Sequence, residues 1–114
     1  MSRASSLSLI LSALVVPLWL VTPAVAVELP NYDPEAYCDR VMEMSGGSMM
    51  IRNGCIQNEQ TAYDDLKESW GSLPEATANY CARVGEMSGG SYMIAKGCVT
   101  NETDASQAPK SFRR

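Results

Sequence analysis

Histidine is absent from all 114 residues of this chain. A serine or cysteine nucleophile would therefore lack its commonest general base, and a zinc or copper site would lack its commonest nitrogen ligand. We accordingly expect a protein that is not an enzyme, with no catalytic residues, no metal site of the usual kind and no cofactor.

Basic charge is also scarce, because nine Lys and Arg stand against thirteen Asp and Glu. Without Arg3, which lies in a predicted leader, eight basic residues remain and the net charge is 8 − 13 = −5. A chain with this balance and no basic stripe is a poor match for nucleic acid or for an anionic lipid surface. A protein partner is compatible with it.

The sequence lacks an apolar run long enough to span a bilayer. The longest, Leu7 to Leu20, has 14 residues, whereas a spanning helix needs roughly 20. Arg3 precedes this run, and Ala24-Val25-Ala26 follows it with small residues at the positions that signal peptidase reads. We predict a signal peptide over residues 1–26 and a mature chain of residues 27–114, exported to a periplasm or secreted, more typical of a bacterium, with no stable membrane anchor after cleavage.

Four cysteines, Cys38, Cys55, Cys81 and Cys98, all fall in the predicted mature chain. An even number of cysteines in a small exported chain is typical of disulfides. Zinc is the alternative, but it prefers closer pairs than these gaps of 17, 26 and 17 residues.

The chain repeats itself at an offset of 43 residues. Residues 37–59 (YCDRVMEMSGGSMMIRNGCIQNE) and 80–102 (YCARVGEMSGGSYMIAKGCVTNE) agree at sixteen of 23 positions. Each cysteine pair is centred on the Gly-Gly of a Ser-Gly-Gly-Ser bend, at Gly46-Gly47 and at Gly89-Gly90. If each bend joins two helices, the paired cysteines lie level with one another, so we predict the bonds Cys38–Cys55 and Cys81–Cys98.

Helical spacing of apolar residues and helix start and stop signals predict an all-α fold. Asp33-Pro34 is a typical start, and Ser72 with Glu75 forms a potential capping box. The predicted helices span about 34–45, 48–69, 74–88 and 91–107. They form two tandem hairpins, each held by one disulfide, within a single domain over 27–108 whose repeats cover about 34–67 and 74–108. We expect an up-down-up-down array with both bends at one end, and a flexible tail over 109–114.

The pattern Tyr-Cys, Gly-Gly-Ser-Tyr, Cys-x-x-x-Glu resembles that of small exported bacterial proteins with no assigned activity. The resemblance covers residues 37–59 and 80–102, and the first copy departs from it at Met49, where the second has Tyr92. It implies no activity.

Six methionines in the mature region allow two interpretations. Methionine fills gaps in cores, and its thioether is also a soft ligand for copper(I). Only Met44/Met87 and Met50/Met93 repeat, and their spacing favours a core position.

Glu59 and Glu102 each lie four residues beyond the second cysteine of a repeat. Hairpin symmetry places Glu59 level with Pro34, so we expect it to cap the first helix through free backbone N–H groups. A catalytic carboxylate pair is the weaker alternative, because nothing in the sequence places the two beside a cleft.

The two bends are candidates for a contact surface. A helix N-terminus after each Gly-Gly could hold an anion, but no lysine or arginine lies in the bends, and a turn accounts for Gly46, Gly47, Gly89 and Gly90. Met49 and Tyr92 are expected to stay partly exposed there and are the candidate residues for binding a partner; the alternative is that the two bends are only turns that lie side by side. The sequence thus predicts an exported, non-enzymatic helical-repeat module that binds a protein or has a structural role in the cell envelope; copper(I) binding and inhibition of an enzyme are the alternatives.

Overall fold

The computed structural model of the protein describes residues 13–15, 17, 19 and 27–114. Most of the predicted signal peptide, residues 1–26, lies outside this set, so its cleavage stays a prediction. Within the described residues, none of the helices combines the length and the apolar character needed to cross a membrane.

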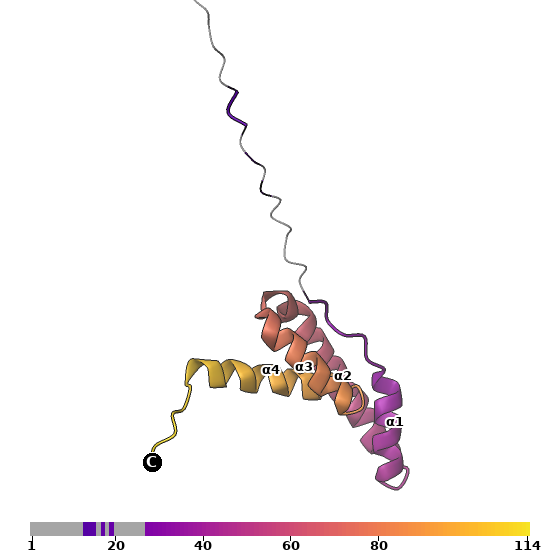
Figure 1. The fold of residues 1–114 in the computed structure, drawn as a ribbon. Helices are drawn as coiled ribbons and strands as arrows, with labels where there is room; N and C mark the ends of the chain where they lie inside the picture. Colours follow the sequence, from indigo (N-terminus) through magenta and orange to yellow (C-terminus); the bar gives the residue numbers. More distant parts are fainter. Residues whose placement is uncertain (1–12, 16, 18, 20–26) are drawn as a thin grey trace, which may run out of the picture.

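Four α-helices make up the fold: α1 (Pro34–Met44), α2 (Met49–Ser69), α3 (Glu75–Met87) and α4 (Tyr92–Gln107), as Figure 1 shows. A short 3-10 turn, η1 (Trp70–Ser72), follows α2, and the described part of the chain contains no strand. The predicted all-α fold is confirmed, and every predicted helix end lies within one residue of the observed end.

Polar side chains fix the starts of three helices. Asp33 Oδ1 accepts a hydrogen bond from Ala36 N at 3.0 Å, and Pro34 occupies the first helical turn. Ser48 and Ser91 cap α2 and α4 in the same way. These caps satisfy N–H groups that have no partner inside the helix.

The capping box predicted at Ser72 and Glu75 is wrong. Ser72 Oγ donates instead to Ser69 O at 2.8 Å, within the 3-10 turn, and no side chain caps α3. The extra turn keeps Ser72 on the α2 side of the connection, two residues before Pro74, so its hydroxyl serves the end of α2.

Each bend places two consecutive glycines at positive φ. Gly46 and Gly47 have φ of 80° and 84°, and Gly89 and Gly90 have 98° and 86°. Residues with a side chain rarely adopt this conformation, so the glycines are required for the turn. We refer to residues 45–48 as the first bend and to residues 88–91 as the second bend.

The predicted disulfide pairing is confirmed. Cys38–Cys55 joins α1 to α2 with a Cα–Cα distance of 5.6 Å, and Cys81–Cys98 joins α3 to α4 at 5.5 Å. Each hairpin is therefore closed by a covalent bond about two helical turns from its bend.

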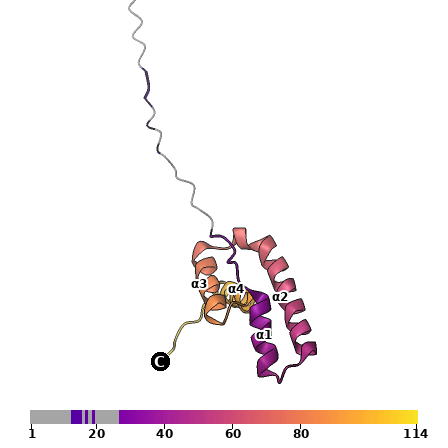
Figure 2. The ribbon, with the colours of Figure 1, turned by 90° about the vertical axis from the view of Figure 1, so that its right-hand side faces the viewer.

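The core lies where the two hairpins meet, not along the whole length of either one. α2 and α4 pack against each other, and an extended arm, residues 27–33, packs onto the same cluster with Val27, Leu29 and Tyr32. Figure 2 views α4 nearly end-on while α1, α2 and α3 are seen from the side, so α4 crosses the others. The buried members of the core are Ala62, Leu66, Trp70, Ala78, Tyr92 and Ala95.

The expectation that both bends share one end of the molecule is wrong. The first bend forms the far tip of the α1–α2 hairpin, whereas the second bend lies beside the start of α1 (Figures 1 and 2). The reason is that α4 crosses α2, so the second hairpin contacts the first hairpin with its bend end. Two bends with the same sequence therefore have different surroundings.

Candidate functional site

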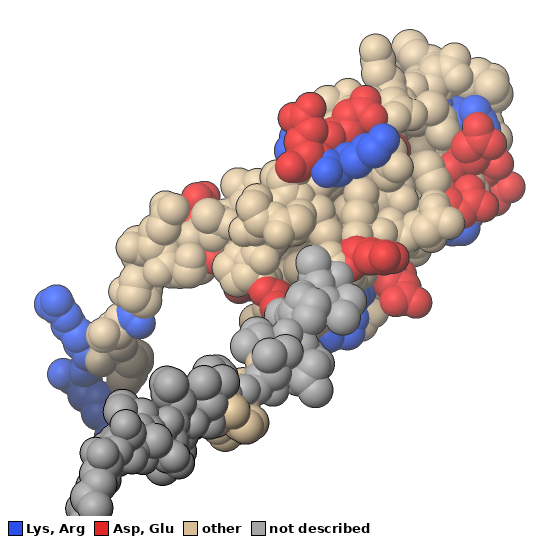
Figure 3. Space-filling model, turned by 90° about the horizontal axis from the view of Figure 1, so that it is seen from above, with Lys and Arg blue, Asp and Glu red and all other residues tan. Residues whose placement is uncertain are grey.

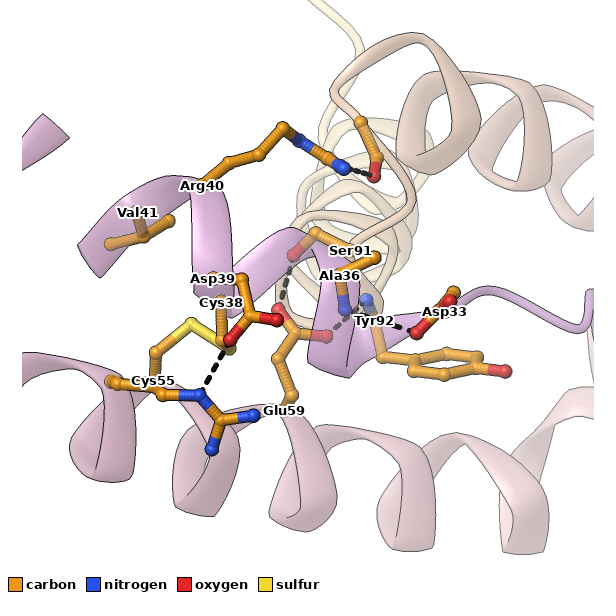
Figure 4. The surroundings of a disulfide bond; sticks show 12 residues. Asp33, Ala36, Cys38, Asp39, Arg40, Val41, Cys55, Glu59, Ser91 and Tyr92 are labelled. Carbon is orange, nitrogen blue, oxygen red and sulfur yellow. Dashed lines mark hydrogen bonds and ion pairs between the residues drawn. A yellow bond between two sulfur atoms is a disulfide. The ribbon is translucent and has the colours of Figure 1, made fainter. Parts of the chain in front are cut away.

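Glu59 is the most deeply buried charged residue of the hairpin junction, with 1% of its surface exposed. It projects from the middle of α2 toward the N-terminus of α4 (Figure 4). Burial of a carboxylate is costly unless its oxygens receive hydrogen bonds. Neighbouring hydrogen-bond donors must therefore stabilise the buried carboxylate of Glu59.

Two donors from the second bend satisfy that carboxylate. Ser91 Oγ donates to Glu59 Oε1 at 2.5 Å, and the backbone N–H of Tyr92 donates to Oε2 at 2.6 Å (Figure 4). The carboxylate thus lies at the positive end of the α4 dipole. Glu59 does cap a helix, but the expected partner was wrong: the helix is α4 of the second hairpin, not α1.

Arg40 and Tyr37 of α1 hold the second bend from the other side. Arg40 Nη2 donates to Gly89 O at 2.6 Å. A Cβ built on Gly89 would lie 3.4 Å from the Tyr37 ring, so the ring is in close contact with the bend. We call Tyr37, Arg40 and Glu59 the first socket, because together they receive the second bend.

Tyr32 of the extended arm contacts the second hairpin on both sides of its bend. Its hydroxyl donates to Ala82 O at 2.5 Å, and its ring packs at 4.8 Å between centroids from Tyr92. Burial raises the pKa of the Tyr32 hydroxyl to about 12, and the negative charge of Glu86 adds to that rise.

Tyr92 was expected to be exposed, and this is wrong. Only 3% of its surface is accessible. Its hydroxyl donates to Pro30 O at 2.9 Å and accepts from Tyr32 N at 3.0 Å, while Tyr63 packs edge-on against its ring. Burial raises the pKa of the Tyr92 hydroxyl above its ordinary value, and the hydrogen bond from Tyr32 opposes the rise. Tyr92 therefore anchors the two hairpins and is not available to a partner.

A cleft of about 290 Å³ opens beside this junction, lined in part by Glu35, Gln60 and Tyr63. Its tyrosine rings pack on one another, and both oxygens of Glu59 already accept hydrogen bonds. The Glu59 carboxylate in this cleft is therefore engaged in holding the second bend. In the described residues, no group of three or more acidic or cysteine side chains is placed to hold a metal ion.

The methionines beside the bends are on the surface, so the predicted core position is wrong. Met44 and Met50 are each 81% exposed, and Met49 is 57% exposed, as expected for that residue. Met87 and Met93 of the second hairpin are exposed as well. The core at the junction is filled by alanines, Leu66 and aromatic rings, which leaves no place for these thioethers.

Glu102 is exposed, although it is the repeat equivalent of the buried Glu59. It lines a groove of about 450 Å³ on the second hairpin together with Tyr80, Val84 and Ile94. Within the described residues, no bend lies against this carboxylate as the second bend lies against Glu59. Glu59 and Glu102 line two different clefts.

Sequence reasoning missed three parts of this junction: the link from Arg40 to Gly89, the role of Tyr32 and the close approach at Gly85. A Cβ on Gly85 would lie 2.8 Å from Tyr32 Cζ. For the close approach at Gly85 the sequence did contain a signal, because the first copy has Met42 at the position where the second has Gly85. A glycine inside a helix often marks a close contact.

Comparison of the chain with models of known families, with curated proteins and with solved structures finds no match.

Proposed function

We propose that this protein is a non-enzymatic binding module whose contact surface for another protein is the tip of the first hairpin. The observation that supports this is the exposure of Met44, Met49, Met50 and Ile51 around the first bend. We refer to these four residues as the methionine tip. Apolar side chains gathered at one projecting bend are typical of a surface that becomes buried in a complex.

The chemistry of methionine suits such a contact. Its side chain is unbranched and polarisable, and it adapts to partners of different shape. Full burial of one such side chain is worth roughly 1.5–3 kcal/mol. Burial of Met49 and Met50 together would therefore contribute roughly 3–6 kcal/mol to binding, before the cost of association is subtracted.

Compartment and charge support the same proposal. Two disulfides are consistent with an oxidising compartment outside the cytoplasm. Acidic and basic side chains are interspersed on the face drawn in Figure 3, with no broad basic surface over the helices. A protein partner suits this surface better than a nucleic acid does.

Polar substitution of the tip tests the proposal. Met49→Gln/Met50→Gln keeps side-chain length and removes apolar character, and Met87→Gln is the matched control at the second bend. Proteins captured by the tagged exported chain from an envelope extract should bind the double variant at least 10-fold more weakly and the control equally well. Equal capture by the double variant and the wild type would contradict a role for the tip.

Copper(I) binding is the second candidate, and the exposure of several thioethers around one bend favours it. Met49→Leu/Met50→Leu distinguishes it from protein binding, since leucine keeps the apolar surface and removes the sulfur. Competition with a copper(I) chelator should show tight binding by the wild type and its loss in the leucine variant. If both chains compete equally, the thioethers of the tip do not bind copper.

A further inference from the structure

We propose that the partner of the methionine tip is a second copy of this chain, which inserts its first bend into a vacant socket on the second hairpin. This inference rests on the proposed function, because it assigns a partner to the same surface. The vacant socket consists of Tyr80, Arg83 and Glu102. The resulting contact is head-to-tail, with the first bend of one copy against α3 and α4 of the next.

The contact of the second bend with the first socket, within one chain, is the template for this contact between copies. The second bend is received by Tyr37, Arg40 and Glu59, through the hydrogen bonds to Gly89 O, Ser91 Oγ and Tyr92 N. Each of these contacts involves either a backbone atom or a residue that both repeats share. The pairing can therefore be repeated wherever the same residues meet again.

All three socket residues recur in the second repeat. Tyr37, Arg40 and Glu59 correspond to Tyr80, Arg83 and Glu102 at the offset of 43. All three of the latter are exposed, and Tyr80 and Glu102 line the groove of about 450 Å³. The second hairpin thus carries the same socket, and no bend occupies it.

The first bend carries the matching groups. Ser45-Gly46-Gly47-Ser48 is identical to residues 88–91, and Ser48 caps α2 as Ser91 caps α4. Met49 N, the counterpart of Tyr92 N, belongs to the first turn of α2, where backbone N–H groups lack helical acceptors. Gly46 O corresponds to Gly89 O.

Charge complementarity supports the pairing. The Glu102 carboxylate would lie at the positive end of the α2 dipole, and the Arg83 guanidinium would meet a carbonyl of the bend. Val84 and Ile94 form an apolar part of the groove beside these polar groups. The polar groups of the two surfaces therefore match in kind.

The chain cannot fill its own socket. The first bend is the tip of one hairpin, and α4 extends away from it (Figure 1). An interface between two different surfaces does not close on itself unless a ring forms, so added copies extend a chain. In tandem helical repeats, terminal units likewise leave one face without a neighbour.

Part of the intramolecular interface is not reproduced. Tyr32, Tyr63 and Leu66 correspond to Glu75, Ser106 and Pro109, so the aromatic packing that strengthens the junction is missing between copies. The association is therefore reversible and depends on protein concentration and on salt.

Sedimentation velocity with complementary variants tests the inference. Met49→Pro blocks the bend: proline suits the first position of a helix and lacks the N–H donor, and Ser48 has the extended backbone (φ −72°, ψ 114°) that proline requires before it. Arg83→Ala/Glu102→Gln blocks the socket. Glu68→Gln/Arg113→Ala makes the same changes of residue type elsewhere and serves as the control.

The wild type and the control should sediment as growing oligomers between about 10 μM and 1 mM, and each blocked variant should stay monomeric. Because each blocked variant keeps one working surface, an equimolar mixture should form heterodimers and nothing larger. A monomeric wild type at 1 mM would overturn the inference, as would oligomers in either blocked variant or a mixture that stays monomeric. Circular dichroism and the masses of the disulfide-linked peptides check that the variants are folded.

The outcomes for the two proposals are separable. A wild type that stays monomeric but captures another protein through Met49 and Met50 would refute self-pairing and support the binding module. Capture that survives Met49→Gln/Met50→Gln would refute the methionine tip as the binding surface, whatever the oligomeric state.

Discussion

At the scale of single residues, the difference between Met42 and Gly85 helps to explain why the two repeats have different surroundings. The two occupy equivalent positions of the repeats, yet only Gly85 lies under the ring of Tyr32, which is 2.8 Å from the place of a Cβ. The Tyr32 hydroxyl bonds to Ala82 O on the same helix. A glycine in α3 is therefore what lets the arm close over the second hairpin.

Gly85→Ala should lower the free energy of unfolding by about 1–3 kcal/mol, because the ring must move out of a packed position. Gly97→Ala is the matched control. Gly97 lies in α4 with nothing within 4 Å of a Cβ, so alanine there should raise stability by about 0.5–1 kcal/mol through helix propensity. Urea unfolding measures both; equal effects of the two substitutions would show that the contact with Tyr32 is unimportant.

Tyr32 also predicts an alkaline limit to stability. Its pKa is raised from 10.0 to about 12 in the folded state. A raised pKa means that the folded protein holds the proton more tightly, so this stabilisation is complete below about pH 10 and is lost as the pH rises toward 12. Absorbance at 295 nm should show Tyr32 and Tyr92 ionising later than exposed tyrosines, and Tyr32→Phe should reduce the late change in absorbance. An unchanged late phase in Tyr32→Phe would show that Tyr32 does not contribute to it.

At the scale of elements, the sequence predicts what is local. Caps such as Asp33, the paired glycines of the bends and the placing of the cysteines determine the helix ends and the disulfides without reference to the rest of the chain. Burial was not predictable in this way. Met49 and Tyr92 follow identical bends, yet one is 57% exposed and the other 3%, because the second bend packs against α1 and α2 and, within the described residues, the first bend has no such neighbour.

At the scale of elements, a prediction follows from the equivalent residues Glu59 and Glu102. Glu59 joins α2 to α4, whereas Glu102 joins no two elements in the described part of the chain. Glu59→Gln removes the negative charge; its NH₂ group can donate to Ser91 Oγ while its oxygen accepts from Tyr92 N, so two charge-assisted hydrogen bonds become neutral ones. We expect a loss of about 1–3 kcal/mol in the free energy of unfolding.

Glu102→Gln is the internal control for that substitution. Its side chain is exposed, and the change should shift the unfolding free energy by less than about 0.5 kcal/mol at low protein concentration. Thermal unfolding at about 5 μM compares the two variants. Similar losses at both positions would mean that the bonds from the second bend to Glu59 add little to stability.

At the scale of the whole molecule, the arrangement of the hairpins depends on residues that no repeat pattern marks. Tyr32, Leu66 and Trp70 have no counterparts in the other copy, and they concentrate the core at the junction. An up-down-up-down bundle would have needed apolar side chains along both hairpins. The exposure of Met44, Met49 and Met50 shows that the tip of the first hairpin lacks such a core.

The last prediction follows from this uneven core. The tip of the first hairpin, about residues 41–52, lies away from the buried cluster and is held by Cys38–Cys55 and by the ion pair of Arg52 with Asp39 at 2.6 Å. An exposed ion pair contributes little, so the disulfide is the main restraint. Amide hydrogens of the tip should exchange by local opening at a lower free energy than those of residues 59–66.

Removal of one disulfide at a time tests this by hydrogen exchange with mass spectrometry. Cys38→Ser/Cys55→Ser should speed exchange mainly in residues 41–52, and residues 59–66 should keep most of their protection because Glu59 and Leu66 belong to the junction. Cys81→Ser/Cys98→Ser should speed exchange at the junction itself, since α3 and α4 both contribute to the core. Uniform acceleration in both variants would show instead that the molecule opens as one cooperative unit, with the disulfides acting on the unfolded chain alone.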